Sequence, residues 1–238
     1  MKIMTFNIQH GLDYLLRLQG IRKVNFEKIA FLINEYKADI VSFNEIYNTG
    51  DEIEFGNQIK KIAKLCNYPY YSFSKAIDTK NGEYGNAIMS KVPFKLKRVY
   101  KIDDPLIKDE NVFYESRVIS SYLFQEFTLY NTHFGLAKSE QNNAFNCFEK
   151  ILNEEKANKI VFLGDFNIEP KNEIILKLKE KFNEVTDYFN SELYTYPSNN
   201  PVKKIDYIFV SKDIKIISSE TIKQIISDHL PIICEIEL

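Results

Sequence analysis

Seven polar side chains of this sequence stand at, or directly beside, the ends of apolar segments that have the composition of β-strands. They are Asn7, Glu45, His133, Asp165, Asn167, Asp228 and His229. Each alone is weak evidence for a site, because Asp and Asn at strand ends usually stabilise turns. Taken together they supply carboxylates, amides and imidazoles, without a Cys or Ser placed beside a base. Hard oxygen ligands of this kind suit Mg²⁺, which keeps several waters, with Mn²⁺ as a substitute. Zinc is disfavoured because it prefers clustered His and Cys.

Asp206 differs from this group because it lies inside an apolar segment, residues 204–210. Burying a carboxylate without a partner costs on the order of several kcal/mol. Asp206 must therefore face a partner or a cleft. The turn at Asp228 and His229 offers the nearest suitable group, and we expect Asp206 and His229 to act as a pair.

The elements that must position these residues alternate between strands and a few helices. Strand patterns cover residues 1–8, 38–43, several segments of 70–133, 159–164, 204–211, 214–225 and 231–237; helical spacing covers a segment starting at Asn25, and residues 53–66, 139–155 and 172–181. Asn25 is a good N-cap residue for the first helix. Short turns between neighbouring strands indicate much antiparallel pairing. Two packed sheets with helices on their outer faces would accommodate this pattern.

The bulk composition bounds the class of protein. The chain has 238 residues, of which 45% are hydrophobic, and we expect one domain over 1–238. The net charge of −2, from 31 basic and 33 acidic residues, excludes a globally basic nucleic-acid-binding protein but leaves room for a local basic rim. Neither a signal-peptide core nor a run of ~20 apolar residues is visible, so a cytoplasmic protein with no membrane span is expected. A monomer is expected.

Short motifs along nearly the whole chain resemble the endonuclease/exonuclease/phosphatase superfamily. In order, they are Thr5-Phe6-Asn7, Phe43-Asn44-Glu45, Gly85-Asn86-Ala87-Ile88-Met89-Ser90, Glu115-Ser116-Arg117, Asn131-Thr132-His133, Gly164-Asp165-Phe166-Asn167, Ile205-Asp206-Tyr207 and Ser227-Asp228-His229. The resemblance implies an α/β (α+β) fold, a four-layer sandwich of two mostly antiparallel β-sheets flanked by helices. Three pieces look closest to small bacterial metal-dependent hydrolases of that superfamily: residues 7–11, 132–136, and 195–198 running into 204–207. One departure is Gln9, where several nuclease members carry an acidic residue, which leaves the number of metals open.

Roles for the site follow from the chemistry and the resemblance together. Glu45 is expected to be the chief Mg²⁺ ligand, with Asn7 and Asp228 completing or water-bridging its shell. Asp165 is expected to act as base or orienter for the attacking water, positioned by Asn167. His229, held by Asp206, is expected to contact the phosphate.

Two further side chains, His133 and Arg117, are expected to hold phosphate oxygens together with Asn167. The role of His10 stays open between lining the site and flanking its loop. Glu83 either buttresses His133 or is a turn charge beside Gly82.

Three functions are consistent with these residues. The first is a Mg²⁺-dependent phosphoesterase that cleaves a phosphodiester or phosphomonoester, with a small or lipid-derived substrate favoured. The second is a nuclease on DNA or RNA with the same chemistry. The third is a non-catalytic binding domain, which the intact polar set argues against. The loops 12–24, 48–58, 78–84, 103–112 and 190–203 are expected to frame the cleft and select the substrate. The apolar segment 14–18 favours a compact phosphoester.

Overall fold

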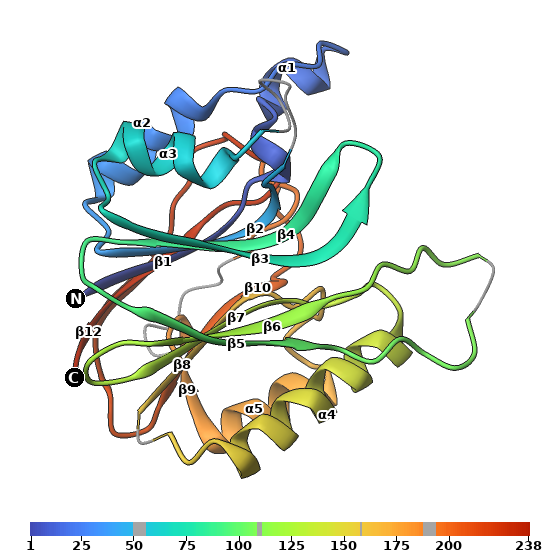
Figure 1. The fold of residues 1–238 in the computed structure, drawn as a ribbon, viewed down its shortest axis with the longest axis vertical. Helices are drawn as coiled ribbons and strands as arrows, with labels where there is room; N and C mark the ends of the chain where they lie inside the picture. The colour runs from blue at the N-terminus through green and yellow to red at the C-terminus, as the bar shows by residue number, and fades with distance from the viewer. Residues whose placement is uncertain (50–55, 109–110, 158, 188–193) are drawn as a thin grey trace.

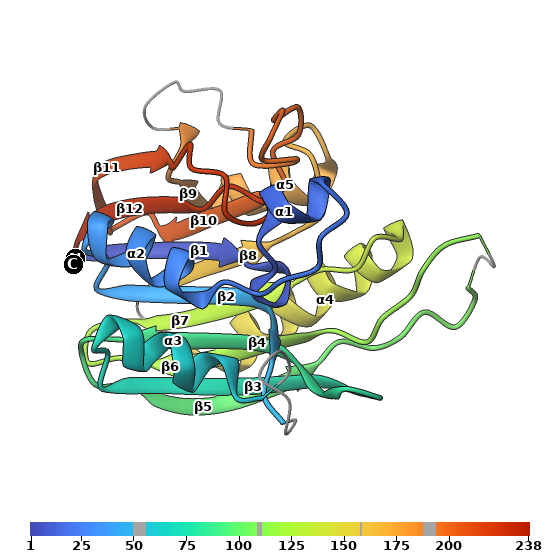
Figure 2. The same ribbon diagram turned by 90° about the horizontal axis from the view of Figure 1, so that it is seen from above.

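Two six-stranded β-sheets pack face to face, with helices on both outer faces (Figures 1 and 2). The computed structural model describes residues 1–49, 56–108, 111–157, 159–187 and 194–238. The first sheet has the order β11 (Lys215–Thr221), β12 (Ile232–Glu237), β1 (Lys2–Asn7), β2 (Ile40–Tyr47), β4 (Gly82–Ser90), β3 (Tyr70–Thr79). The second has the order β5 (Lys95–Lys101), β6 (Val118–Leu123), β7 (Thr128–His133), β8 (Ile160–Asp165), β10 (Asp206–Ser211), β9 (Phe182–Glu184). The prediction of two sheets is confirmed.

Strand pairing is antiparallel except at the centre of each sheet. Among the described strands, β1 pairs with β2 in parallel, and so does β7 with β8. Parallel neighbours end at the same edge of a sheet, and their carboxyl ends commonly build a site there. Asn7 at the end of β1 thus lies opposite Asn44, and His133 at the end of β7 lies opposite Asp165 at the end of β8.

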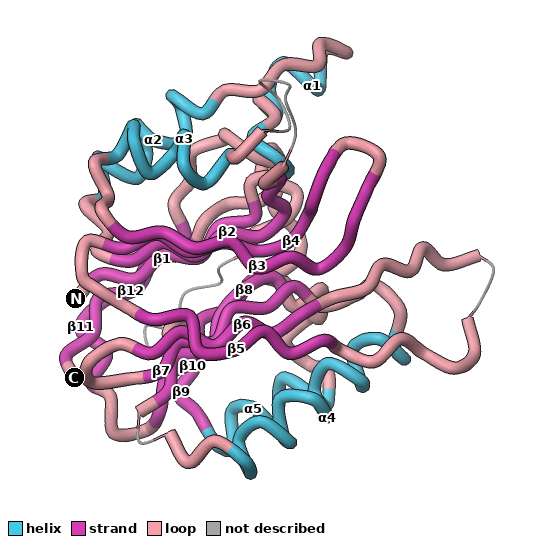
Figure 3. The backbone as a smooth tube through the Cα atoms, viewed as in Figure 1, coloured by secondary structure: helices cyan, strands magenta, loops and turns pink. Residues whose placement is uncertain are grey.

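The helices complete the outer layers (Figure 3). Helices α2 (Phe26–Tyr36) and α3 (Gln58–Cys66) cover the first sheet, whereas α4 (Lys138–Glu154) and α5 (Glu173–Lys181) cover the second. As predicted, the side chain of Asn25 caps α2, accepting a hydrogen bond from the backbone N–H of Lys28. The short α1 (Tyr14–Leu18) and a 3₁₀ turn (Gln9–Gly11) follow β1. None of the helices in the described part of the chain is long and apolar enough to cross a membrane.

Three buried hydrophobic layers separate the four structural layers. One lies between the first sheet and its helices, one between the two sheets, and one between the second sheet and its helices. The third layer is rich in aromatic rings, with Phe148 of α4 stacked on Phe162 of β8 at a centroid distance of 3.7 Å. This packing holds β8, and therefore Asp165 at its end, rigidly between the sheet and α4.

Several boundaries differ from the predicted ones. The expected helix over 53–66 spans Gln58–Cys66, with residues 53–55 outside the described part of the chain. The strand expected over 38–43 continues to Tyr47, because β2 keeps pairing with β4 beyond an irregularity between Phe43 and Ile46. Asp206, expected inside a strand, is instead the first residue of β10. The strand expected over 214–225 ends at Thr221.

Candidate active site

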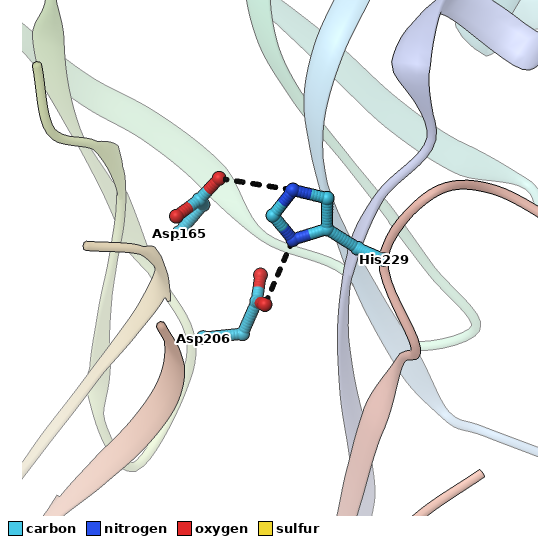
Figure 4. A group of neighbouring side chains, drawn as sticks. All are labelled: Asp165, Asp206 and His229. Carbon is cyan, nitrogen blue, oxygen red and sulfur yellow. Dashed lines mark hydrogen bonds and ion pairs between the residues drawn. The ribbon is translucent and has the colours of Figure 1, made fainter. Parts of the chain in front are cut away.

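The predicted polar residues gather where β1, β7 and β8 end and β10 begins. In the antiparallel pairing of β10 with β8, Asp206 lies directly opposite Asp165. The turn that precedes β12 brings His229 to both of them (Figure 4). His229 Nδ1 is 2.9 Å from Asp206 Oδ2, and His229 Nε2 is 3.7 Å from Asp165 Oδ2. The partner expected for Asp206 is therefore present.

The close packing of these three buried side chains shifts the pKa of His229 and that of Asp165. Burial alone would lower the pKa of His229, but the carboxylates of Asp206 and Asp165 outweigh it and raise that pKa to about 10. Burial, together with the charge of Asp206, raises the pKa of Asp165 to about 7. Ligand atoms of the three lie within 4.8 Å of one another. Both ring nitrogens of His229 face a carboxylate oxygen, so the three side chains form an ion-pair cluster.

One oxygen of Asp165 lies at the centre of the site. Asn7 Nδ2 donates to Asp165 Oδ2 at 3.0 Å, and His133 Nε2 lies 3.5 Å from the same oxygen. The other oxygen, Oδ1, accepts the backbone N–H of Asn167 at 2.9 Å. Nitrogens of Asn7, His133 and His229 therefore surround Asp165 Oδ2, which orients the carboxylate in one direction.

A buried network of three amides beneath Asp165 joins the two sheets. Asn44 Oδ1 of β2 accepts the backbone N–H of Asp165, while Asn44 Nδ2 donates to Asn131 Oδ1 of β7 and to Asn86 Oδ1 of β4. Asn131 Nδ2 donates to the carbonyl oxygens of Phe43 and Ala87. Such buried polar groups are costly unless they are paired, and here they are paired across the sandwich.

The sequence alone assigns these amides no role, although all three belong to the motifs given above. The sequence feature that could have identified them is an amide side chain inside an otherwise apolar strand. Gly164 supports the same region: its φ is +139°, and a Cβ there would lie 1.9 Å from the carbonyl oxygen of Thr132. Only glycine permits this approach of β8 to β7.

The oxygen-rich part of the site surrounds Glu45. Glu45 has φ +59° and sits at the β-bulge where the pairing of β2 with β4 shifts between Phe43 and Ile46. Bulges of this kind redirect a side chain, here out of the sheet edge. Asn7 Nδ2 donates to Glu45 Oε1 at 3.1 Å, and Gln9 Nε2 donates to Asp228 Oδ2. Burial and the charge of Glu45 raise the pKa of Asp228, although His229 opposes the shift.

This donor set suits a hard divalent cation. Glu45 and Asp228 are two carboxylates that raise the electrostatic cost of each other's charge. The buried Gln9 Oε1 has no hydrogen-bond partner within the described residues. An unpaired buried oxygen on a side chain that contacts the carboxylate of Asp228 is what Mg²⁺ or Mn²⁺ would satisfy. Asn7 presents its nitrogen to the carboxylates, since its Oδ1 accepts the backbone N–H of Gln9.

The remaining predicted residues lie close by. Arg117 Nη1 is 2.9 Å from His133 Nδ1, and the side chain of Asn167 donates to the carbonyl oxygen of Phe134. His10 Nδ1 lies 3.7 Å from Glu45 Oε2, so His10 borders the site. Glu83 contacts Lys75 at 3.5 Å and accepts from Asn48 at 3.1 Å, both away from His133, which fits the alternative of a turn charge.

The site opens into a cavity of about 890 Å³. Its floor carries Glu45, His133, Asp165, Asp228 and His229, and its walls include Tyr84, Phe113, Leu136, Ile168, Tyr196 and Ile205. The segments expected to frame the cleft contribute Tyr84, which lies in β4, and Tyr196 and Lys203, whereas Phe113 lies one residue beyond the predicted loop 103–112. Residues 50–55, 109–110 and 190–193 of those loops lie outside the described part of the chain.

Comparisons with known proteins agree with this geometry. The model of the Endonuclease/Exonuclease/phosphatase family matches residues 4–229. A Bacteroides thetaiotaomicron protein of that family has 15% identity and a TM-score of 0.76, over 99% of this chain and 97% of that one. A mannosyl-6-phosphatase from the same organism has 15% identity and a TM-score of 0.75, with each chain fully covered. The human Nocturnin catalytic domain has 18% identity and a TM-score of 0.68, over 100% of this chain and 94% of that one.

At these identities the structural likeness shows the fold alone. A search among curated proteins finds no match. The family assignment depends on the family model, which spans the chain from β1 to the turn before β12. The chain belongs to the endonuclease/exonuclease/phosphatase family.

Proposed function

We propose that this protein is a divalent-metal-dependent hydrolase of a compact phosphoester, which it cleaves by direct attack of water on phosphorus. The observation that carries the proposal is the meeting of an imidazolium–carboxylate pair, His229 with Asp206, and an oxygen-rich group around Glu45 in one cavity. The family is one of hydrolases that act on phosphoesters.

Glu45 and Asp228 would hold the cation, with Gln9 Oε1 as a neutral oxygen beside them. Asn7 would align Glu45 with Asp165 through its amide nitrogen. A bound Mg²⁺ or Mn²⁺ would neutralise the charge that develops on the phosphate during the reaction. Side chains of the protein orient the attacking water, accept its proton and contact the phosphate.

Asp165 is the residue we assign to orient the attacking water and accept its proton. Its pKa of about 7 suits a base that works near neutral pH. Asn7, the backbone N–H of Asn167 and the amide of Asn44 fix its position. The left-handed backbone of Asn167, with φ +52°, aims that N–H at Asp165 Oδ1.

His229 is the residue we assign to contact the phosphate with a charged N–H. Asp206 binds its Nδ1 and thereby directs Nε2 toward the space beside Asp165. A charged donor held in place stabilises the oxygen charge of the transition state without reorganisation. His133 adds a second imidazole, whose Nε2 lies 3.5 Å from Asp165 Oδ2.

The charge of the cavity favours a compact substrate over a nucleic-acid duplex. Five carboxylates line it, Glu45, Glu115, Asp165, Glu169 and Asp228, against the cations Arg117 and Lys203 and the imidazolium of His229. Four basic residues of β5, Lys95, Lys97, Arg98 and Lys101, lie on an edge strand away from the cavity floor, where such charges commonly prevent edge pairing. One structural relative is named a mannosyl-6-phosphatase, a name consistent with a small phosphorylated substrate.

A comparison of substrates tests this size preference. With Mg²⁺, we expect hydrolysis of small phosphoesters at enzyme concentrations that produce little nicking of supercoiled DNA, and weak, unspecific DNA binding. A duplex-binding protein that makes six or more phosphate contacts loses ~10³-fold in affinity between low and moderate salt, whereas a compact ester should show a shallow salt dependence.

The panel should include abasic DNA, RNA, inositol phosphates, a sugar phosphate and sphingomyelin, assayed at two salt concentrations. Rapid Mg²⁺-dependent nicking of supercoiled DNA by catalytic amounts of enzyme, abolished in His229→Ala, would identify DNA as the substrate in place of a compact ester. That outcome would leave the assignment of the site unchanged.

A further inference from the structure

Arg117 contacts His133 in a way that leaves only one arrangement of protons. Arg117 Nη1 lies 2.9 Å from His133 Nδ1. A guanidinium has five N–H donors, no acceptor, and does not lose its proton in proteins. His133 Nδ1 must therefore carry a lone pair that accepts this hydrogen bond. A neutral imidazole with Nδ1 unprotonated carries its single proton on Nε2.

Arg117 is itself held in this position by the carboxylate of Glu115. The same Nη1 is 2.7 Å from Glu115 Oε1, and the Arg117 side chain is about one-tenth exposed. The backbone N–H of Glu115 donates to Glu140 Oε1 in the first turn of α4. Gly135 makes room for Glu140, since a Cβ on Gly135 would lie 2.3 Å from the Glu140 carboxyl carbon. The segment before β6 is thus tied to the start of α4.

The fixed proton of His133 points at the centre of the site. His133 Nε2 lies 3.5 Å from Asp165 Oδ2, the oxygen that Asn7 and His229 also approach. The two imidazoles that flank Asp165 are thus held in different states. Against the effect of burial, two carboxylates raise the pKa of His229, whereas burial, Arg117 and His229 lower the pKa of His133 well below its ordinary value. Such opposed environments commonly separate the duties of paired groups.

We propose that Arg117 is a positioning residue that holds His133 as a neutral Nε2–H donor beside Asp165, so that His133 donates a hydrogen bond in the reaction and accepts no proton. The catalytic role of His133 in this proposal rests on the proposed function, but its tautomer can be measured without any substrate. It adds a second role to the expected one of holding phosphate oxygens, because Nη1 contacts Glu115 and His133, whereas Nε has no hydrogen-bond partner among the described residues.

The tautomer is tested directly by NMR on protein labelled with ¹⁵N-histidine. The chain has only three histidines, His10, His133 and His229, so each signal can be assigned by its loss in a single His→Asn variant. Long-range ¹H–¹⁵N couplings separate the Nε2–H, Nδ1–H and doubly protonated forms. We expect His133 to be Nε2–H at pH 7 in the wild-type protein, with Nδ1 unprotonated.

The Arg117→Met variant removes the donor while keeping an unbranched side chain of similar length. We expect its His133 to show a mixture of tautomers, and kcat to fall about 10-fold with KM changed less than 3-fold, as the loss of one hydrogen bond would produce. Arg117→Gln offers an amide oxygen that can accept Nδ1–H, and it should shift His133 further toward that tautomer. The matched control is Arg98→Met, which removes an exposed arginine of β5 and should alter neither the NMR signals nor the kinetics.

Two results would overturn the proposal. One is a wild-type His133 with a proton on Nδ1, a measurement that requires no variant to fold. The other is an Arg117→Met protein whose His133 spectrum is unchanged while KM rises 10-fold or more, since that would identify Arg117 as a direct phosphate ligand. If the wild-type protein hydrolyses no phosphoester, that result would instead contradict the proposed function and leave the tautomer result unaffected.

Discussion

Replacement of His229 by alanine is expected to lower kcat/KM for a small phosphodiester by about 10³-fold, because it removes a charged donor that is aimed at the phosphate. Asp206→Asn should lower it by about 10²-fold, since the amide no longer stabilises the imidazolium that two carboxylates maintain. The measurement is steady-state hydrolysis with Mg²⁺ in excess. The matched control is Asp213→Asn, an exposed carboxylate just after β10, which should leave the rate unchanged.

The double variant distinguishes a pair from two independent residues. If Asp206 acts through His229, Asp206→Asn/His229→Ala should be little worse than His229→Ala alone, because residues that act as a unit are not additive. If the loss of kcat/KM in the double variant equals the product of the two single-variant losses, each residue has its own role. Retention of full activity in His229→Ala would remove His229 from the site.

Replacement of Glu45 by glutamine is expected to reduce turnover by ~10²-fold or more and to weaken Mg²⁺ binding, because the change keeps the shape of the side chain and removes its charge. The side chain is only 22% exposed, yet it sits at the bulge of β2 and not in the hydrophobic layers, so the fold should persist. Calorimetric titration with Mg²⁺ and the rate of hydrolysis measure the two effects.

Glu126→Gln is the matched control for this change, since Glu126 is an exposed carboxylate in the turn between β6 and β7. It should bind Mg²⁺ and turn over substrate as the wild type does. Wild-type affinity and wild-type rate in Glu45→Gln would exclude Glu45 as the chief ligand.

The layers of the fold were predictable because their signals are local. Apolar runs bounded by turn residues indicated the strands, and helical spacing with Asn25 as N-cap indicated α2. The family resemblance then implied the four-layer arrangement, which the two sheets and the flanking helices confirm.

The sequence did not predict features that depend on register between distant strands. The bulge that redirects Glu45 exists only because β2 and β4 shift against each other, a relation that no local pattern contains. Likewise, Asn44, Asn86 and Asn131 meet only when the two sheets pack.

The site was predicted as a set of residues and not as a set of contacts. Asp206 and His229 were expected to pair, since a carboxylate in an apolar segment needs a partner, and they do. Arg117 was expected to face the phosphate, because a guanidinium suits that role in general. Its engagement with His133 and Glu115 depends on how the segment before β6 is tied to α4, which is a tertiary relation.

In the proposed mechanism, a divalent cation held near Glu45 and Asp228 enables this chain to hydrolyse a phosphoester. The most direct measurement is the hydrolysis of a small phosphodiester and a small phosphomonoester by protein stripped of metal with EDTA, before and after addition of Mg²⁺ or Mn²⁺. We predict no turnover above background in the stripped protein and restoration on addition of either ion, saturating with ion concentration. Full turnover by the stripped protein, or no turnover of any phosphoester with either ion, would contradict metal-dependent phosphoester hydrolysis by this protein.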